Sequence, residues 1–225
     1  MGRSGRPKIS RELVLDAALA LVDRDGIAGL SMRKLGVQLG IEAMTLYYYF
    51  PNKDAILDGL IEREAIKALN VPVGPPEEWA RWLRGLAVAL HEELLRHPRL
   101  LPLIATRPAM TPVSLRLVEQ IVAGLCATGL SPLHAFQVLN IVTTFVVGHT
   151  LAEVGETPGH EDAAPDTAAL EGTLDPLEFP FLAAAIADGL GQTEDHRSRF
   201  EFALDALFAG MAMLASQKGH DDSSD

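Results

Sequence analysis

Residues 31–53 have the sequence SMRKLGVQLGIEAMTLYYYFPNK, and this stretch decides the fold of the chain. Ser31 is suited to cap a helix whose Leu35 and Leu39, four residues apart, lie on one face. Gly40 comes next, and glycine adopts the left-handed conformation at a helix end without steric cost. The chain can therefore reverse here, and the pattern predicts the first helix and the turn of a helix-turn-helix.

A second helix should follow this turn. Glu42 favours a helix N-terminus, and Leu46 and Phe50 continue the apolar face. The other side chains of this helix are candidates for DNA contacts, because short residues fit near the groove walls and aromatic residues reach phosphates and thymine methyl groups. These candidates are Ala43, Met44, Thr45, Tyr47 and Tyr48. On the pattern alone, an ordinary helical hairpin remains an alternative.

Nearby basic residues complete the expected DNA-binding surface. Arg33 and Lys34 lie outside the apolar face of the first helix, and Lys53 stands at the start of a further helix. We expect Arg33 to contact a guanine, because arginine can donate two hydrogen bonds to that base. The expected phosphate contacts are Thr45, Tyr47 and Lys53, and the expected base-edge contacts are Ala43, Met44 and Tyr48.

The run TLYYYFPNKDAIL, residues 45–57, resembles the TetR/AcrR family of repressors. The DNA-binding domain of that family typically carries a TLYxHF-like segment, followed by a lysine and a long connecting helix. The resemblance covers roughly residues 10–69. It implies an all-α fold, with an N-terminal three-helix helix-turn-helix domain and a C-terminal helical domain for ligand binding and dimerisation. The implied partners are a double-stranded DNA operator, a small-molecule effector and a second copy of the chain.

Charge is divided unevenly along the 225 residues. Residues 1–54 carry a net +2 and residues 55–225 a net −13, which together give the formal charge of −11. Phosphate contact needs a local basic face rather than a basic protein, and an acidic remainder limits non-specific adhesion to DNA. The overall negative charge is therefore compatible with DNA binding.

Composition indicates a folded protein, since 48% of the residues are hydrophobic. Cys126 is the only cysteine, so an internal disulfide and a thiolate zinc cluster are both excluded. We expect no apolar run to reach the roughly 20 uncharged residues that span a bilayer, and the start MGRSGRPKIS lacks the apolar segment of a secretory signal. The expected location is cytoplasmic, without membrane contact.

The N-terminal region is expected to begin with a basic arm over residues 2–8, which either frays or enters the minor groove. Ser10 should cap a first helix that runs to about Asp25, where Gly26 stops it. Asn52 should begin the connecting helix, and the prolines of residues 72–76 mark a linker. The predicted regions are 1–54 for DNA binding, 55–71 for the connecting helix, 77–218 for ligand binding and dimerisation, and 219–225 for a disordered tail.

The second domain is predicted to be helical, with an acidic loop over residues 155–178. Its expected helices are 77–97, 99–105, 111–128, 131–154, 179–190 and 194–218. The last of them carries an apolar stripe formed by Phe200, Leu204, Leu207, Phe208, Met211 and Leu214. Two recognition helices must lie about one DNA turn (~34 Å) apart to read a palindrome. We therefore predict that helices 131–154 and 194–218 pair with their symmetry mates in a four-helix bundle; burial of the stripe within one subunit is the alternative.

The segments WARWLRGLAVALHEELLRHP, ATRPAM and TTFVVGHTLAEVGE are similar to the C-terminal domain of the tetracycline repressor class of that family. The resemblance implies an effector pocket beside a turn at residues 106–108, although a plain helical core has a similar apolar composition. The predicted lining is Trp82, Leu86, Leu90, Leu103, Thr106, Arg107, Phe136, Leu139, Asn140, Thr143, Thr144 and Val147. We expect a largely hydrophobic or aromatic ligand, with Arg107 meeting an acid or a carbonyl group.

Several departures from that class concern metal binding. Two histidines that help to bind magnesium-tetracycline there are replaced by Leu103 and Thr144, and polar residues that hold the drug correspond to Leu69 and Leu86. Leucine cannot form hydrogen bonds through its side chain. We therefore expect neither a metal ion at this pocket nor a cofactor.

The remaining histidines suggest no catalytic site. His149 and Glu153 are expected beside the pocket rather than in it, and His91 and His97 are expected to be solvated. An enzyme would need a nucleophile–base pair or a metal cluster, and the pattern shows neither. The protein is therefore predicted not to be an enzyme. A regulator of the same fold without a small-molecule inducer, either a constitutive repressor or an activator, remains open.

Overall fold

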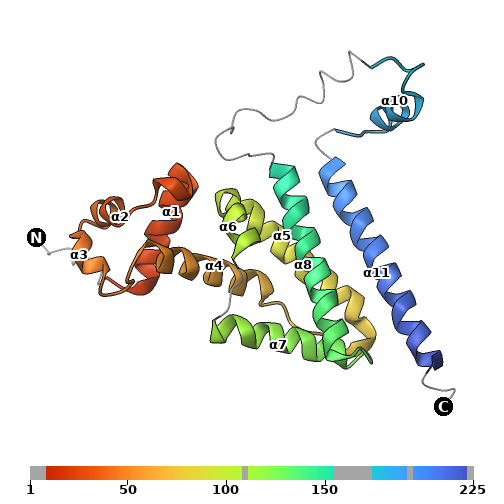
Figure 1. Ribbon diagram of the computed structural model, residues 1–225, viewed down its shortest axis with the longest axis horizontal. Helices are drawn as coiled ribbons and strands as arrows, with labels where there is room; N and C mark the ends of the chain where they lie inside the picture. Colours follow the sequence, from red (N-terminus) through yellow and green to blue (C-terminus); the bar gives the residue numbers. More distant parts are fainter. Residues whose placement is uncertain (1–8, 108–110, 155–173, 192–194, 222–225) are drawn as a thin grey trace, which may run out of the picture.

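The structure is a computed structural model that describes residues 9–107, 111–154, 174–191 and 195–221, with side chains up to residue 213. All regular elements in these ranges are helices, which confirms the predicted all-α fold. Helices α1 to α3 form a small domain at one end, and α4 leads from it into a larger helical body (Figure 1). The basic arm over residues 2–8 lies outside the described residues.

The N-terminal domain consists of α1 (Arg11–Gly29), α2 (Met32–Leu39) and α3 (Ala43–Leu46). The hydroxyl of Ser10 caps α1 by accepting a hydrogen bond from the amide of Leu13 at 3.2 Å. Gly26 interrupts α1 with a φ of 72°, which glycine adopts without strain, and the helix resumes for one short turn. The predicted stop at Gly26 is therefore a kink, and the helix ends at Gly29.

The core of this domain includes the first half of α4 (Lys53–Leu69). Asn52 caps α4 by accepting a hydrogen bond from the amide of Ala55 at 2.8 Å. Its apolar face then packs on α1 and on the helix-turn-helix segment. The largest fully buried side chains of this core are Leu21, Leu30, Leu35, Leu46, Phe50, Ile56 and Leu60. The connecting helix is thus part of the DNA-binding domain over its first turns.

Two short elements join the N-terminal domain to the body, namely η2 (Pro98–Leu100) and α6 (Leu101–Thr106). Leu100 and Leu103 pack into the N-terminal core, whereas Leu101 packs into the core of the body. Ile104 contacts both cores. A movement of α6 must therefore disturb the packing of both domains, because closely packed protein interiors have low compressibility and transmit strain.

The body has its main core between the long helices α5, α7, α8 and α11, and α8 and α11 lie side by side (Figure 1). Its elements are η1 (Pro76–Glu78), α5 (Trp79–Arg96), α7 (Pro112–Cys126), α8 (Pro132–Val154), α10 (Pro180–Ala187) and α11 (Asp195–Asp221). The expected helices are present, with ends shifted by a few residues. Since α11 reaches Asp221, the first three residues of the predicted tail 219–225 are helical. Residues 155–173 of the predicted acidic loop lie outside the described ranges.

Helix α8 corrects one expectation from the sequence. It is long and apolar enough to cross a membrane by length and composition, so the expectation that no such run exists was wrong. However, one face of α8 packs in the body through Ala135, Leu139 and Val146. Exposed polar side chains such as Asn140 and Thr144 lie on another face. The core helix of a globular domain meets the same length criterion.

The apolar stripe of α11 is also used differently from the main prediction. Phe200, Leu204 and Phe208 are buried in the core of their own subunit, and Met211 packs against that core. Leu214 lies where side chains are not described. These positions face α5 and α8. This part of the stripe therefore packs within the subunit, which was the alternative, and not against a symmetry mate.

Candidate nucleic-acid interface and ligand cavity

The first helix and the turn of the helix-turn-helix have the local structure that the sequence predicts. The second helix is shorter than expected, because it ends at Leu46 and Tyr47, Tyr48 and Phe50 follow it outside the helix. The Ser31 hydroxyl accepts a hydrogen bond from the Lys34 amide at 3.2 Å, which caps α2. Gly40 adopts the left-handed conformation (φ 65°, ψ 34°), and the Ile41 amide donates to the Gly36 carbonyl at 2.9 Å. This hydrogen bond closes the end of α2 in the way that left-handed caps do, and it directs the chain into α3.

The expected reading residues of α3 and the following turn lie at the surface. The exposed fractions are 74% for Met44, 47% for Tyr47 and 87% for Tyr48, and Thr45 is also exposed. Ala43 is half-buried beside them. Large exposed apolar side chains in one short segment are unusual for a solvated surface, and they are typical of a binding surface. Contact with DNA bases stays a prediction for each of these residues.

The basic candidates differ in how free their side chains are. Arg33 is exposed, and its guanidinium has no hydrogen bond or ion pair with any residue that the structure describes. Lys34 is exposed and lies 3.7 Å from the carboxylate of Asp25. Lys53 is half-buried and donates from Nζ to the Ile27 carbonyl at 2.7 Å. Lys53 therefore holds α4 against the end of α1, and a phosphate contact would use its remaining donors.

Two positioning residues were missed by the sequence analysis. The Arg11 guanidinium donates to the Tyr49 carbonyl at 2.7 Å and lies 4.2 Å from the centre of the Phe50 ring. The Tyr49 hydroxyl donates to the Ile9 carbonyl at 3.0 Å. Together these contacts fix the start of α1 on the aromatic run. Tyr49 occupies the position of the histidine in the TLYxHF-like motif, and this was the available signal.

A cavity of about 620 Å³ lies in the body, bounded by α4, α5, α6, α7 and α8. This volume is in the range of small-molecule sites. Nine of the twelve predicted lining residues are in its wall: Leu90, Thr106, Arg107, Phe136, Leu139, Asn140, Thr143, Thr144 and Val147. Further lining residues, which the sequence did not predict, come mainly from α4 and α7: Ile61, Ala65, Leu69, Ala105, Ser114, Val118, Gly148 and Leu151.

Three predicted lining residues lie elsewhere. Trp82 and Leu86 are buried in the core of the body, on the part of α5 that packs directly against neighbouring helices. The Trp82 ring lies against the backbone of Gly74 and Gly124, where any larger residue would collide with it or with its neighbours. Leu103 is buried in the N-terminal core. An apolar helix face does not reveal which of its turns borders a cavity and which borders another helix.

Half of the polar residues in the cavity wall lie on α8. The Thr143 hydroxyl donates to the Leu139 carbonyl at 3.0 Å, and the Thr144 hydroxyl donates to the side-chain oxygen of Asn140 at 3.1 Å. The Asn140 oxygen is thereby occupied, and its amide N–H groups donate to no residue in the described ranges. A ligand can therefore be oriented by a hydrogen-bond acceptor that faces Asn140.

Arg107 forms hydrogen bonds within the chain. Its guanidinium donates to the carboxylates of Asp58 at 2.9 Å and Asp54 at 3.2 Å, both on α4. Hydrogen bonds from Arg107 to Asp58 and Asp54 raise the pKa of the guanidinium above its ordinary value. The expected contact of Arg107 with an acid or carbonyl group of a ligand stays a prediction. Within the chain, this residue ties the end of α6 to α4.

The histidines expected to be solvated are instead paired. His91 Nε2 lies 2.7 Å from a carboxylate oxygen of Glu153, and His97 Nδ1 lies 3.0 Å from a carboxylate oxygen of Asp23. Their side chains are 13% and 19% exposed. The prediction of solvated histidines was wrong because Glu153 and Asp23, far away in the sequence, fold back onto them.

An exposed helix-turn-helix, joined by one helix to a helical body with a cavity, is the architecture of a DNA-binding transcriptional regulator. The family model described as "Bacterial regulatory proteins, tetR family" matches residues 14–60. The model described as "Tetracyclin repressor-like, C-terminal domain" matches residues 71–215, more than half of the chain. The chain therefore belongs to the TetR family of bacterial regulatory proteins, as its sequence predicted.

Individual relatives support this assignment. The chain is 32% identical to an HTH-type transcriptional regulator of Saccharopolyspora erythraea, over 93% of this chain and 87% of that protein. It is 31% identical to the class A tetracycline repressor protein from transposon 1721 of Escherichia coli, over 84% of this chain and 90% of that protein. A solved TetR variant from Acinetobacter baumannii AYE, in complex with minocycline, is 28% identical with a TM-score of 0.68, over 92% of this chain and 99% of that chain.

Proposed function

We propose that this protein is a cytoplasmic transcriptional repressor that binds a palindromic operator as a homodimer and is released by a largely hydrophobic or aromatic small molecule. The observation that carries the proposal is the position of α6. This helix lines the cavity through Thr106 and Arg107 and also packs into the N-terminal core through Leu103. Ligand occupancy and the position of the DNA-binding domain therefore depend on the same element.

The release mechanism follows from the contacts of α6. A ligand that displaces α6 pulls Arg107 away from Asp54 and Asp58, which lie on the first turns of α4. Leu103 moves with it and disturbs the core beneath the recognition segment. A coupling free energy of about 1–3 kcal/mol between ligand and DNA binding is typical of allosteric proteins and corresponds to about 5–150-fold in affinity. The same coupling makes DNA weaken ligand binding by the same factor.

The homodimer is supported by the outer faces of α8 and α11. On α11, Phe202, Ala206, Ala209 and Met213 are exposed at helical spacing, which places them on one face. On α8, Leu133 and Ile141 are 65% and 48% exposed. An apolar face of this kind, on two adjacent helices, suits an isologous interface in which each subunit presents the same surface. This interface replaces the α11 stripe that the sequence analysis favoured.

The ligand chemistry is suggested by the cavity wall. The only charged lining residue in the described part of the chain is Arg107, which is already paired. Most of the remaining lining residues are apolar, beside the hydroxyl groups of Thr106, Ser114, Thr143 and Thr144, and the Asn140 amide is available as a donor. These features favour an uncharged, mostly apolar molecule with a carbonyl or hydroxyl oxygen as its acceptor.

Fluorescence anisotropy with labelled DNA from the region upstream of the protein's own gene tests the proposal. We expect saturable binding of two subunits per site, and release by one or more members of a library of apolar and aromatic compounds. A replacement of Thr143 by Phe, which fills the cavity, should abolish release and preserve DNA binding. Binding that no compound affects would favour a constitutive regulator, and equal binding to unrelated DNA would contradict an operator-specific function.

A further inference from the structure

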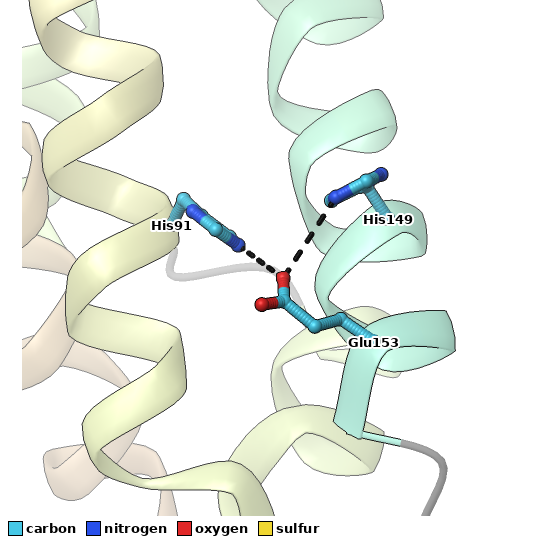
Figure 2. A group of neighbouring side chains, drawn as sticks. All are labelled: His91, His149 and Glu153. Carbon is cyan, nitrogen blue, oxygen red and sulfur yellow. Dashed lines mark hydrogen bonds and ion pairs between the residues drawn. The ribbon is translucent and has the colours of Figure 1, made fainter. Parts of the chain in front are cut away.

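Three side chains outside the cavity converge between α5 and α8. His91 on α5 points toward Glu153 on α8, and His149, one turn before Glu153, points toward the same carboxylate (Figure 2). The distances to the same Glu153 oxygen are 2.7 Å from His91 Nε2 and 3.8 Å from His149 Nε2. One potential ligand atom from each residue lies within 4.8 Å of the other two. None of these residues lines the cavity.

His149 has a nitrogen without a hydrogen bond in this cluster. Its side chain is 8% exposed, and Nε2 is buried without a hydrogen-bond partner. The ring is held by Phe145 and Phe200, whose centres lie 5.6 Å and 5.2 Å away. A buried polar atom without a hydrogen-bond partner is costly, and in natural proteins it calls for an explanation such as a function, an ordered water molecule or an ion. The cluster thus offers a positioned, unused ligand atom.

A second group of acidic and histidine side chains, Glu64, Glu93 and His97, shows the contrasting case. The Lys67 ammonium lies 2.6 Å from Glu64 and 3.8 Å from Glu93, and Arg96 pairs with Glu93. Cations of the protein already neutralise that group. In the described part of the chain, His91 and His149 are the only basic side chains that lie within ion-pair distance of Glu153. The nearby cation Arg199 is held by Asp195 at 3.1 Å.

We propose that His91, His149 and Glu153 bind one divalent transition-metal ion of the Zn²⁺ type. Two imidazoles and one carboxylate form a ligand set that suits Zn²⁺ and not Mg²⁺ or Ca²⁺, which prefer oxygen ligands. Zn–N and Zn–O bonds of about 2.0–2.1 Å in a tetrahedron place ligand atoms ~3.3 Å apart. The observed separations of 2.7 Å and 3.8 Å lie on either side of this value. Small side-chain rotations therefore assemble the site, with a water molecule as the fourth ligand.

The bound ion would link α5 to α8, the helix that supplies half of the polar residues in the cavity wall. Burial lowers the pKa of His149, the charge of His91 lowers it further and Glu153 raises it. Arg199 and His196 on α11 add a smaller lowering of the pKa of His149. The three residues need neither DNA nor an effector to bind the ion, so this inference does not rest on the proposed function.

Calorimetric titration of the tag-free, chelator-treated full chain with ZnCl₂ tests the site. We expect one Zn²⁺ per chain with micromolar or tighter affinity that excess Mg²⁺ does not reduce. His149→Gln and Glu153→Gln should each weaken binding by more than about 10-fold, since even outer-shell changes cost 10-fold or more. His134→Gln, the same change on the same helix outside the cluster, should retain wild-type affinity.

Glu153→Gln keeps an oxygen that accepts a hydrogen bond from His91, so the fold should persist; circular dichroism checks this. In Co²⁺-loaded wild-type protein, visible d–d absorption bands should appear, and Glu153→Gln should lose them. Absence of stoichiometric Zn²⁺ binding in the wild type overturns the proposal. Equal affinity in the wild type and in both cluster variants also overturns it, because the ion must then bind elsewhere.

Discussion

Replacing Gly36 by Ala should strain the turn of the helix-turn-helix. A Cβ atom on Gly36 would lie 2.9 Å from the carbonyl oxygen of Ile41 and 3.1 Å from the amide nitrogen of Ala43. Both are backbone atoms, so neither can rotate away as a flexible side chain can. Overpacking costs about 1–3 kcal/mol, and the higher helix propensity of alanine offsets up to about 1 kcal/mol. The expected net destabilisation is about 1–2 kcal/mol.

This destabilisation should lower the apparent Tm by about 2–8 °C, since 1 kcal/mol shifts Tm by about 2–4 °C in a chain of this size. Because relief of the clash must move α3 relative to α2, operator affinity should also fall at least about fivefold, which corresponds to about 1 kcal/mol. Thermal melting by circular dichroism and anisotropy with operator DNA measure the two effects.

Gly85→Ala is the matched control, because a Cβ atom there makes an ordinary 3.9 Å contact with Val71 in the middle of α5. This substitution should raise Tm by up to about 4 °C through helix propensity and leave DNA binding unchanged. If the Gly36→Ala protein melts and binds DNA like the wild type, the turn is not as closely packed as described.

Three further predictions concern coupling, pH and assembly. Leu103→Ala should destabilise the chain by about 2–4 kcal/mol and weaken ligand-induced release without weakening ligand binding, because this side chain packs in the N-terminal core; unchanged release would count against α6 as the link. Burial lowers the pKa of His149 below its ordinary 6.5, so this side chain binds a proton more readily in the unfolded state than in the folded state. The contribution of His149 to the free energy of unfolding is therefore fully present above pH 6.5 and is lost as the pH falls below it. Metal-free His149→Gln should therefore show a shallower loss of stability in urea unfolding between about pH 6.5 and pH 5, whereas an identical slope would refute this origin. Phe202→Asp places a charge on a side chain that is 75% exposed and should convert the dimer to a monomer in sedimentation velocity at micromolar concentration; a wild-type protein that is already monomeric would refute the interface.

The sequence predicted the helix-turn-helix well because its signals are local. Ser31 caps the helix that follows it, Gly40 ends that helix, and the apolar side chains of Leu46 and Phe50 define the buried face within a few residues. These features depend on the intrinsic conformations of a short segment, and the tertiary structure does not overrule them. The all-α fold and the family followed from the same stretch.

The cavity was predicted only in part, because its wall depends on how distant helices meet. Polar side chains on the apolar helix α8, such as Asn140 and Thr143, indicated a cavity, and both residues lie in its wall. Trp82 and Leu86 carry no feature that distinguishes a cavity wall from a helix–helix contact. Leu103 was misplaced because α6 lies between two cores, and a pattern in one helix does not identify the core that each turn faces.

The charged contacts were the least predictable. Arg107 is 53 and 49 residues away from Asp54 and Asp58, and His91 is 62 residues away from Glu153. Such pairs form only when the complete fold brings the helices together. The pattern of a single sequence does not show which distant side chains come together in the fold. His91 was therefore assigned to solvent and Arg107 to a ligand.

The central claim is that the surface of α2 and α3 reads a specific operator. Anisotropy titrations of the wild type, Arg33→Ala and Arg81→Ala against the protein's upstream DNA and an unrelated duplex test it directly. Arg33→Ala should lose about 1–3 kcal/mol of specific binding, whereas Arg81→Ala, an exposed arginine on α5, should bind like the wild type. If Arg33→Ala retains full affinity and preference for the upstream DNA, or if the wild type shows no preference between the two duplexes, the account is contradicted.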